Sequence, residues 1–162
     1  MSDSLHQARE LLRDVTPLRA DCGQVCGGAC CRSLPGEMTG MLLFPGEERY
    51  YRGRPGYELL ETETGPLLVC AGTCNRAERP LSCRLFPLLP VLRAEGVKVA
   101  MDARARAACP LAAQGVRGLS EAFVETVRHA GQALCEDETQ RAFLRRLTEE
   151  QDELRALQKR FG

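Results

Sequence analysis

Apolar residues recur at helical spacing at both ends of the chain, and this pattern predicts helices in both regions. Near the N-terminus, apolar positions three and four residues apart predict a helix over about 4–18 that ends or bends near Pro17. Towards the C-terminus, the same spacing predicts a helix capped by Ser120 and running to about Leu134. Residues 137–160 predict one long helix or two shorter ones. The inward positions of this last segment are expected to be Phe143, Leu144, Leu147, Leu154 and Leu157.

The middle of the chain is expected to hold short strands and turns. Glycine-rich residues 22–36 predict a loop, and a short apolar run follows at 41–44. The patterns further predict a strand pair at 57–63 and 66–70, a one-turn helix within 79–87, and a hairpin of 88–93 with 97–101. Together these patterns predict a small α+β fold with a few short antiparallel strands and a loop-built cysteine core. We expect one domain over 1–162, with an N-terminal helix at 1–21, the cysteine core at 22–110 and C-terminal helices at 111–162.

Composition and charge narrow the classes of partner. The 22 Lys and Arg residues balance 22 Asp and Glu residues, so no basic field favours nucleic acid or an anionic membrane. Aromatic residues make up 5% of the chain, without tryptophan, which argues against base-stacking surfaces. No apolar run reaches the length needed to span a bilayer, and the N-terminus carries early acids rather than the apolar core of a secretory signal. We therefore expect a cytoplasmic protein with no nucleic acid or membrane partner.

Cysteines are the most informative residues of the chain, and eight of the nine fall in two dense groups and one late position. They are Cys22, Cys26, Cys30 and Cys31, then Cys70, Cys74 and Cys83, then Cys109, whereas Cys135 stands apart. In a reducing compartment such groups are more often metal ligands than disulfides, and an odd number suits a disulfide framework poorly. The eight grouped cysteines are therefore the candidate metal ligands.

The spacing of the cysteines bears on the identity of the metal. Structural zinc sites typically use pairs separated by two residues, whereas the leading pair of each group here is separated by three, and Cys30 and Cys31 are adjacent. The dipeptide Cys109-Pro110 is similar to the ending of some bacterial cluster motifs. This pattern slightly favours an iron–sulfur cluster over Zn²⁺, and it leaves disulfide-forming or redox thiols as a third alternative.

Positive charge lies close to these cysteines in the sequence. Arg79 and Arg84 flank Cys83, and a cationic surrounding favours the deprotonated sulfur that binds metals. If the site also holds an anionic substrate, two guanidinium groups are suited to grip it bidentately. Arg79 and Arg84 are therefore candidate residues for binding a cofactor or substrate.

The cysteine pattern, together with residues 79–87 (RPLSCRLFP), resembles the zinc- or iron-chelating CxxCxxCC domain family, often called YkgJ-like cysteine cluster proteins. The resemblance covers about 22–109 and implies that the eight grouped cysteines bind zinc or iron. Three residues rather than two separate Cys26 from Cys30, so the choice between Cys30 and Cys31 as a ligand stays open. Some longer relatives are flagellin lysine methylases, but nothing in this chain reads as a methyl-donor site, so that activity is not expected.

Three functions remain open from the sequence. The first is a metal or iron–sulfur protein that serves redox chemistry, metal handling or a protein partner. The second is an iron–sulfur-dependent enzyme that acts on an anionic substrate. The third is a zinc-stapled interaction module whose helical C-terminal third docks another protein. Metal ions are the expected partners in all three cases, and whether the chain is an enzyme stays open.

Overall fold

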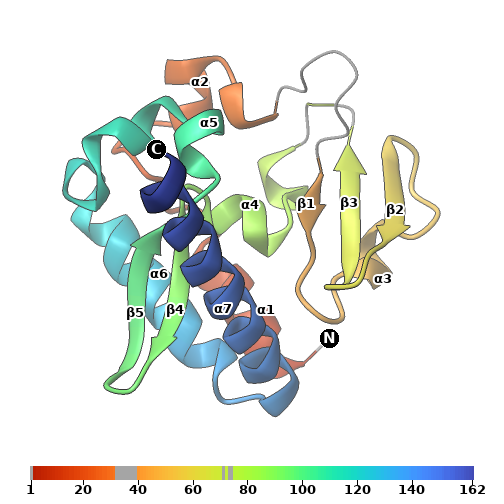
Figure 1. Cartoon of the computed structure of the whole chain (residues 1–162). Coiled ribbons are helices and arrows are strands. Elements are labelled where there is room, and N and C mark those ends of the chain that lie inside the picture. The colour runs from red at the N-terminus through yellow and green to blue at the C-terminus, as the bar shows by residue number, and fades with distance from the viewer. Residues whose placement is uncertain (1, 32–39, 71, 73–74) are drawn as a thin grey trace.

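Helix α4 (Leu81–Leu85) lies between a mostly helical part of the molecule and a small three-stranded sheet (Figure 1). The computed structural model describes residues 2–31, 40–70, 72 and 75–162. The helical part contains α1 (Asp3–Leu11), α6 (Glu121–Leu134), α7 (Glu138–Phe161) and the hairpin of β4 (Leu88–Arg93) and β5 (Gly96–Met101). The sheet has the order β1-β3-β2, formed by β1 (Met41–Leu42), β2 (Tyr57–Glu61) and β3 (Pro66–Cys70), with α3 (Glu48–Tyr51) beside it. Short helices lie in the connections: α2 (Cys22–Cys26), η1 (Ala29–Cys31), η2 (Arg76–Glu78), α5 (Ala105–Ala108), η3 (Pro110–Gln114) and η4 (Val116–Gly118).

The main hydrophobic core lies where α6 packs against α1 and against the hairpin, and where α7 packs against β4. Phe123 and Val127 are 0% exposed, because residues four apart lie on the same face of α6. Gly131 allows α6 to approach the hairpin closely, since a Cβ at that position would lie 2.5 Å from the Cβ of Pro90. The packing of α6 on the hairpin therefore depends on this glycine.

The three-stranded sheet has a smaller core of its own. Leu43, Tyr51 and Leu68 are buried together there. Leu68 of the central strand β3 lies opposite Met41 of β1 on one side and opposite Leu59 of β2 on the other. Strand β3 is thus paired with β2 along its whole length and with β1 at Leu67 and Leu68, and it ends at a cysteine.

Most of the elements predicted from the sequence are confirmed, including the α+β class. The strand pair, the hairpin and the one-turn helix that carries Cys83 lie in the expected regions. Helix α6 begins after Ser120 and ends at Leu134, as predicted, although the side chain of Ser120 makes no capping hydrogen bond. The C-terminal segment forms one helix rather than two.

The N-terminal helix is shorter than the sequence predicts, because it ends at Leu11. The carbonyl oxygens of Arg13 and Val15, which a longer helix would use internally, accept hydrogen bonds from the guanidinium of Arg76 at 3.2 and 3.1 Å. The predicted loop at 22–36 is also only partly a loop, since it contains α2 and η1, and its last five residues lie outside the described part of the chain.

Two of the five apolar positions expected to face inward on α7 are exposed, whereas the first three are buried. Leu154 is 37% exposed and Leu157 is 50% exposed. At this end of the helix the inward side is polar, because Arg155 and Gln158 donate hydrogen bonds at 2.6 and 2.9 Å to main-chain carbonyls at and after the end of β5. Charged residues recur along the whole of α7, and within the described residues no helix is both long and apolar enough to cross a membrane.

Candidate metal centre

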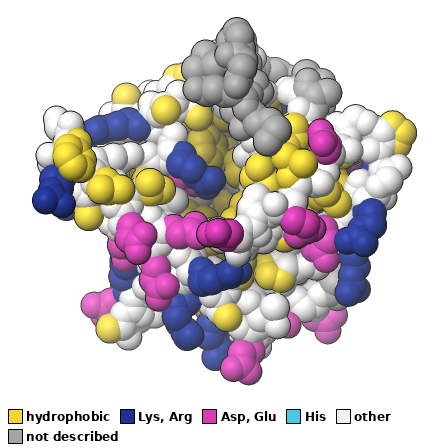
Figure 2. Space-filling view, turned by 45° about the vertical axis from the view of Figure 1, so that its right-hand side comes forward, with side chains coloured by type: hydrophobic (Ala, Val, Ile, Leu, Met, Phe, Trp, Pro, Cys, Tyr) yellow, Lys and Arg dark blue, Asp and Glu magenta, His cyan; other side chains and the backbone are white. Residues whose placement is uncertain are grey.

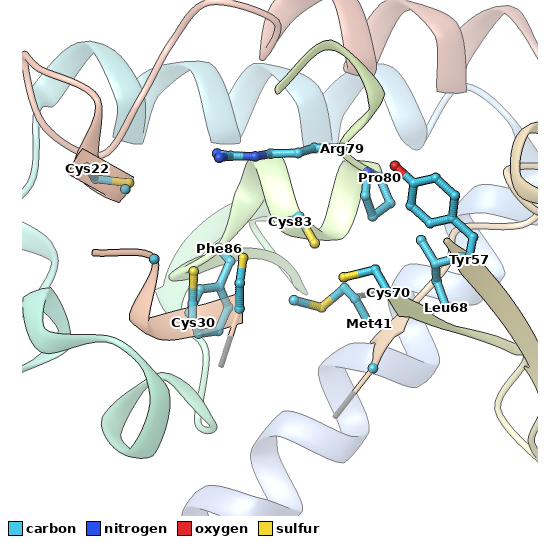
Figure 3. A pocket seen from close by; sticks show the side chains of 14 residues that line it. Cys22, Cys30, Met41, Tyr57, Leu68, Cys70, Arg79, Pro80, Cys83 and Phe86 are labelled. Carbon is cyan, nitrogen blue, oxygen red and sulfur yellow. The ribbon is translucent and has the colours of Figure 1, made fainter. Parts of the chain in front are cut away.

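Five of the eight candidate ligands line one pocket, although they come from separate segments of the chain. The pocket has a volume of about 90 Å³ and lies between α2 with η1, the end of β3, and α4. The five residues are Cys22, Cys30, Cys31, Cys70 and Cys83. Figure 3 shows the sulfur atoms of Cys70 and Cys83 near each other in the middle of the view, with Cys30 and Cys22 on its left-hand side. A recess opens on the face shown in Figure 2, and its walls carry side chains of the hydrophobic class, which includes cysteine.

The first cysteine group is shaped by a one-turn helix followed by a 3₁₀ turn. Asp21 caps α2, because its Oδ1 accepts a hydrogen bond from the amide of Gly23 at 3.0 Å. Gly27 ends α2 with a φ of 65°, a left-handed conformation that glycine adopts without the strain a Cβ would cause. Helix η1 begins two residues later and brings Cys30 and Cys31 to the pocket.

The backbones of the two cysteine groups lie against each other. Gly72, which follows Cys70 closely, has a φ of 88°, and a Cβ built on it would lie 3.2 Å from the carbonyl oxygen of Cys31. Such a separation is tighter than ordinary van der Waals contact, so a larger residue would force the two groups apart. A glycine at this position therefore permits the approach that forms the pocket.

A buried carboxylate holds helix α4, and with it Cys83, at the pocket. Glu47 is 0% exposed and accepts hydrogen bonds from the amides of Leu81 at 2.8 Å and Phe44 at 3.1 Å, and from the guanidinium of Arg9. The residue that precedes α4 is a proline without a side-chain cap, so the carboxylate of Glu47 takes over the capping role. Burial raises the pKa of Glu47, while the charge of Arg9 and the amide donors oppose that rise.

Arg84 binds main-chain carbonyls beside the pocket and does not line the pocket. Its guanidinium donates hydrogen bonds to the carbonyl oxygens of Arg79 at 2.9 Å, Arg9 at 2.9 Å and Ala77 at 2.8 Å. The residue is 9% exposed, and burial together with the nearby Arg9 lowers its pKa. This arrangement differs from the expectation that Arg84 grips an anionic ligand, because the donors required for that role are bonded to the main chain.

Arg79, by contrast, lines the pocket. Figure 3 shows its side chain extending across the pocket towards Cys22. For Cys22, burial and the charges of Cys26 and Asp21 outweigh the effect of Arg79, so the pKa of that thiol is raised. The guanidinium acts in the opposite direction on both Cys22 and Cys31, because a positive charge stabilises a thiolate. Arg79 therefore supplies the cationic surrounding expected beside a thiolate centre.

The adjacent thiols of Cys30 and Cys31 are not equivalent. A hydrogen bond with Cys30 lowers the pKa of Cys31 to about 6, and the charge of Arg79 contributes to this against the effect of burial. The same hydrogen bond, together with partial desolvation of the thiol, raises the pKa of Cys30. The two thiols are joined by this hydrogen bond and both line the pocket, so the choice between Cys30 and Cys31 as a ligand stays open.

The other cysteines lie outside the lining of the pocket or outside the described residues. Cys26 ends α2, and Cys109 packs against the main core. Both are close enough for their charges to raise the pKa of Cys22. Cys74 lies outside the described part of the chain. Cys135 follows α6 and borders a separate surface depression, as expected for a cysteine that stands apart.

The types of donor at this site fit a thiolate-bound metal, whereas their present spacing does not form a complete ligand set. Among residues 2–31, 40–70, 72 and 75–162, no three Cys, His, Asp or Glu side chains are grouped closely enough to hold one ion. Ligation of a common ion or cluster by the cysteines of the pocket would therefore draw their sulfur atoms together.

Sequence reasoning missed two residues that shape the site. Met41 lines the pocket, but its sequence context indicates only a short apolar run. Glu47 is the buried cap of α4, but its neighbour Glu48 is the same residue type in the same acidic pair, so the sequence holds no signal that separates them. Both roles depend on contacts between distant segments.

Comparisons of the chain with protein-family models, with curated proteins and with solved structures found no match in any of the three. The resemblance to the CxxCxxCC domain family therefore stays a prediction.

Proposed function

We propose that this protein binds a metal centre, an iron–sulfur cluster or Zn²⁺, through thiolates of the two cysteine groups and Cys109. The biological role that we propose is redox chemistry, metal handling or service to a protein partner. We place it in the cytoplasm, because thiolates remain available as ligands in a reducing compartment. The same donors suit both metals, since cysteine thiolates hold zinc sites as well as iron–sulfur clusters.

One observation carries this proposal: five cysteines from separate segments line a single pocket beside Arg79. Buried cysteines elsewhere in proteins act as small hydrophobic residues, and that role needs no convergence. Here the contact between Gly72 and the carbonyl of Cys31 and the capping of α4 by Glu47 both serve to bring sulfur-bearing segments together. Such an arrangement supports a shared ligand for these thiols.

A second candidate function is an enzyme that uses the metal centre on an anionic substrate. The observation in its favour is that the pocket combines sulfur atoms with the guanidinium of Arg79 and with the aromatic side chain of Phe86, while Cys30 is exposed. A small anionic substrate would then be held by Arg79 next to the metal. For the docking-module alternative, the exposed large apolar side chains in the C-terminal third are Leu154, Leu157 and Phe161 of α7.

The first experiment is anaerobic purification followed by an absorption spectrum and by quantification of iron, sulfide and zinc on one sample. Matched iron and sulfide with broad visible absorption would identify a cluster protein, whereas a colourless protein with zinc would identify a zinc site. A Cys70→Ser, Cys83→Ser double variant should lose the metal, and Cys135→Ser should retain it. A folded, reduced wild-type protein that binds neither metal would refute the proposal.

A further inference from the structure

The side chain of Met41 lies on the same face of the small sheet as Cys70. Met41 is directly opposite Leu68 in the antiparallel pair of β1 and β3, and directly opposite residues project from the same face. Cys70 lies two residues beyond Leu68 in β3, so it projects from that face as well. Met41 and Cys70 are therefore diagonal neighbours, a separation that long side chains can bridge.

A hydrogen bond between α4 and β1 brings Cys83 to the same place. The hydroxyl of Ser82 donates to the carbonyl oxygen of Leu42 at 2.5 Å. Because Ser82 precedes Cys83 and Leu42 follows Met41, this bond holds the two sulfur-bearing residues near each other. Figure 3 shows the sulfur atoms of Met41, Cys70 and Cys83 directed into the same part of the pocket.

These three sulfur atoms form a donor set that differs from those of zinc and iron–sulfur sites. A thioether is neutral and soft, and it binds a metal without first losing a proton. Protein ligands of zinc are thiolates, imidazoles and carboxylates, and iron–sulfur clusters take cysteine thiolates. Thiolate and thioether sulfurs together are the ligands that suit Cu(I). A thioether beside two thiols therefore points to a soft monovalent ion.

The surroundings suit a complex of low charge. The described residues that line the pocket are cysteines, Met41, apolar or aromatic residues, glycines and Arg79. Cu(I) bound by two thiolates and one thioether carries a single net negative charge, and the guanidinium of Arg79 lines the same pocket. Zn²⁺ bound by four thiolates would leave two negative charges in the same apolar setting, where unbalanced charge is costly.

We propose that Met41, Cys70 and Cys83 form a binding site for Cu(I), with the thioether sulfur of Met41 as a direct ligand. This inference rests on the proposed function, in which cysteines of the pocket bind metal, and it adds Cu(I) to the iron–sulfur cluster and Zn²⁺ named there as a metal that this part of the pocket can hold. The competing role for Met41 is packing, since methionine commonly fills gaps between apolar side chains such as Leu68 and Phe86. A test must therefore separate ligation from the filling of space.

The test is an anaerobic competition for Cu(I) between the reduced protein and the chromogenic chelator bathocuproine disulfonate. Met41→Leu keeps the volume of the side chain and removes the sulfur, and Met101→Leu is the matched control, because Met101 lies in β5 and does not line the pocket. Loss of even an outer-shell partner lowers metal affinity about tenfold or more. We therefore expect Met41→Leu to bind Cu(I) at least about tenfold more weakly than wild type or Met101→Leu. Its affinity for Zn²⁺ should stay unchanged.

A second measurement gives its main result on the wild-type protein, so that result does not depend on how a variant folds. Wild-type protein labelled with selenomethionine and loaded with Cu(I) should show selenium as a neighbour of copper in X-ray absorption at the copper edge, and Met41→Leu should lose that signal. Unchanged Cu(I) affinity in Met41→Leu, an equal loss of Cu(I) and Zn²⁺ binding, or the absence of a selenium neighbour would overturn the inference. If the wild type binds zinc or iron but not Cu(I), this inference fails and the proposed function stands. If it binds none of the three metals, both fail.

Discussion

Replacement of Arg84 by methionine should destabilise the metal-free protein substantially. Methionine retains much of the aliphatic stem but removes a guanidinium that joins three segments through the carbonyls of Arg9, Ala77 and Arg79. A hydrogen bond from a charged group contributes about 1.5–3 kcal/mol when it is buried, which applies to the bond to Arg9. The other two bonds are partly buried, and about 0.5–1 kcal/mol each is appropriate because water can replace them. The sum is a loss of about 2.5–5 kcal/mol, a large part of the stability of a typical domain.

Urea unfolding followed by circular dichroism, with reductant and a chelator present, would measure this loss in the absence of metal. Arg128→Met is the matched control, because Arg128 lies on the exposed side of α6 and is bonded only locally, to Glu125 and His129. The control should unfold at the urea concentration of the wild type. A shared midpoint for Arg84→Met and Arg128→Met would refute the reasoning. If Arg84→Met lost stability only when a metal or anion was bound, Arg84 would instead be a ligand-binding residue.

Cys83→Ser should lower the metal bound per chain while Cys135→Ser leaves it unchanged, as metal quantification after anaerobic gel filtration would show; equal contents in the two variants would contradict the assigned ligands. Gly72→Ala should lose more stability and more metal than Gly56→Ala. Both positions have a positive φ, 88° and 83°, which costs about 1 kcal/mol, but only a Cβ at Gly72 meets backbone of the first cysteine group. Equal losses in urea unfolding would argue against that contact. Burial alone would raise the pKa of Asp102, but hydrogen bonds and charge from its neighbours lower it below the ordinary value. The ionised carboxylate therefore stabilises the fold above about pH 4, and this contribution disappears as the pH falls through the lowered pKa. Asp102→Asn should flatten the dependence of the urea midpoint on pH below about pH 4, and an unchanged slope would rule out this role.

The local elements of the fold could be predicted because they depend on patterns within short stretches of the chain. One face is buried in helix α6, in the strand pair β2–β3 and in the hairpin β4–β5. The spacing of apolar residues in each segment indicates which face that is. The predictions failed where polar side chains distant in the sequence form hydrogen bonds with main-chain carbonyls. Arg76 takes carbonyl oxygens that would have continued α1, and the turn after β5 requires donors from α7, so that a polar side faces inward at the end of that helix.

By itself, the sequence determined the chemical character of the candidate site, which is grouped thiols with arginines nearby. It also showed that positive and negative charges balance and that no apolar run is long enough to span a bilayer. The tertiary structure alone decided which of these groups meet. It brings Cys31 against Gly72, bonds Arg84 to the main chain while Arg79 lines the pocket, and adds Met41 and Glu47. The physical reason is that a thiol, a thioether or a carboxylate carries the same intrinsic chemistry wherever it occurs. Its role depends on burial and on partners that strand register and long-range packing bring together.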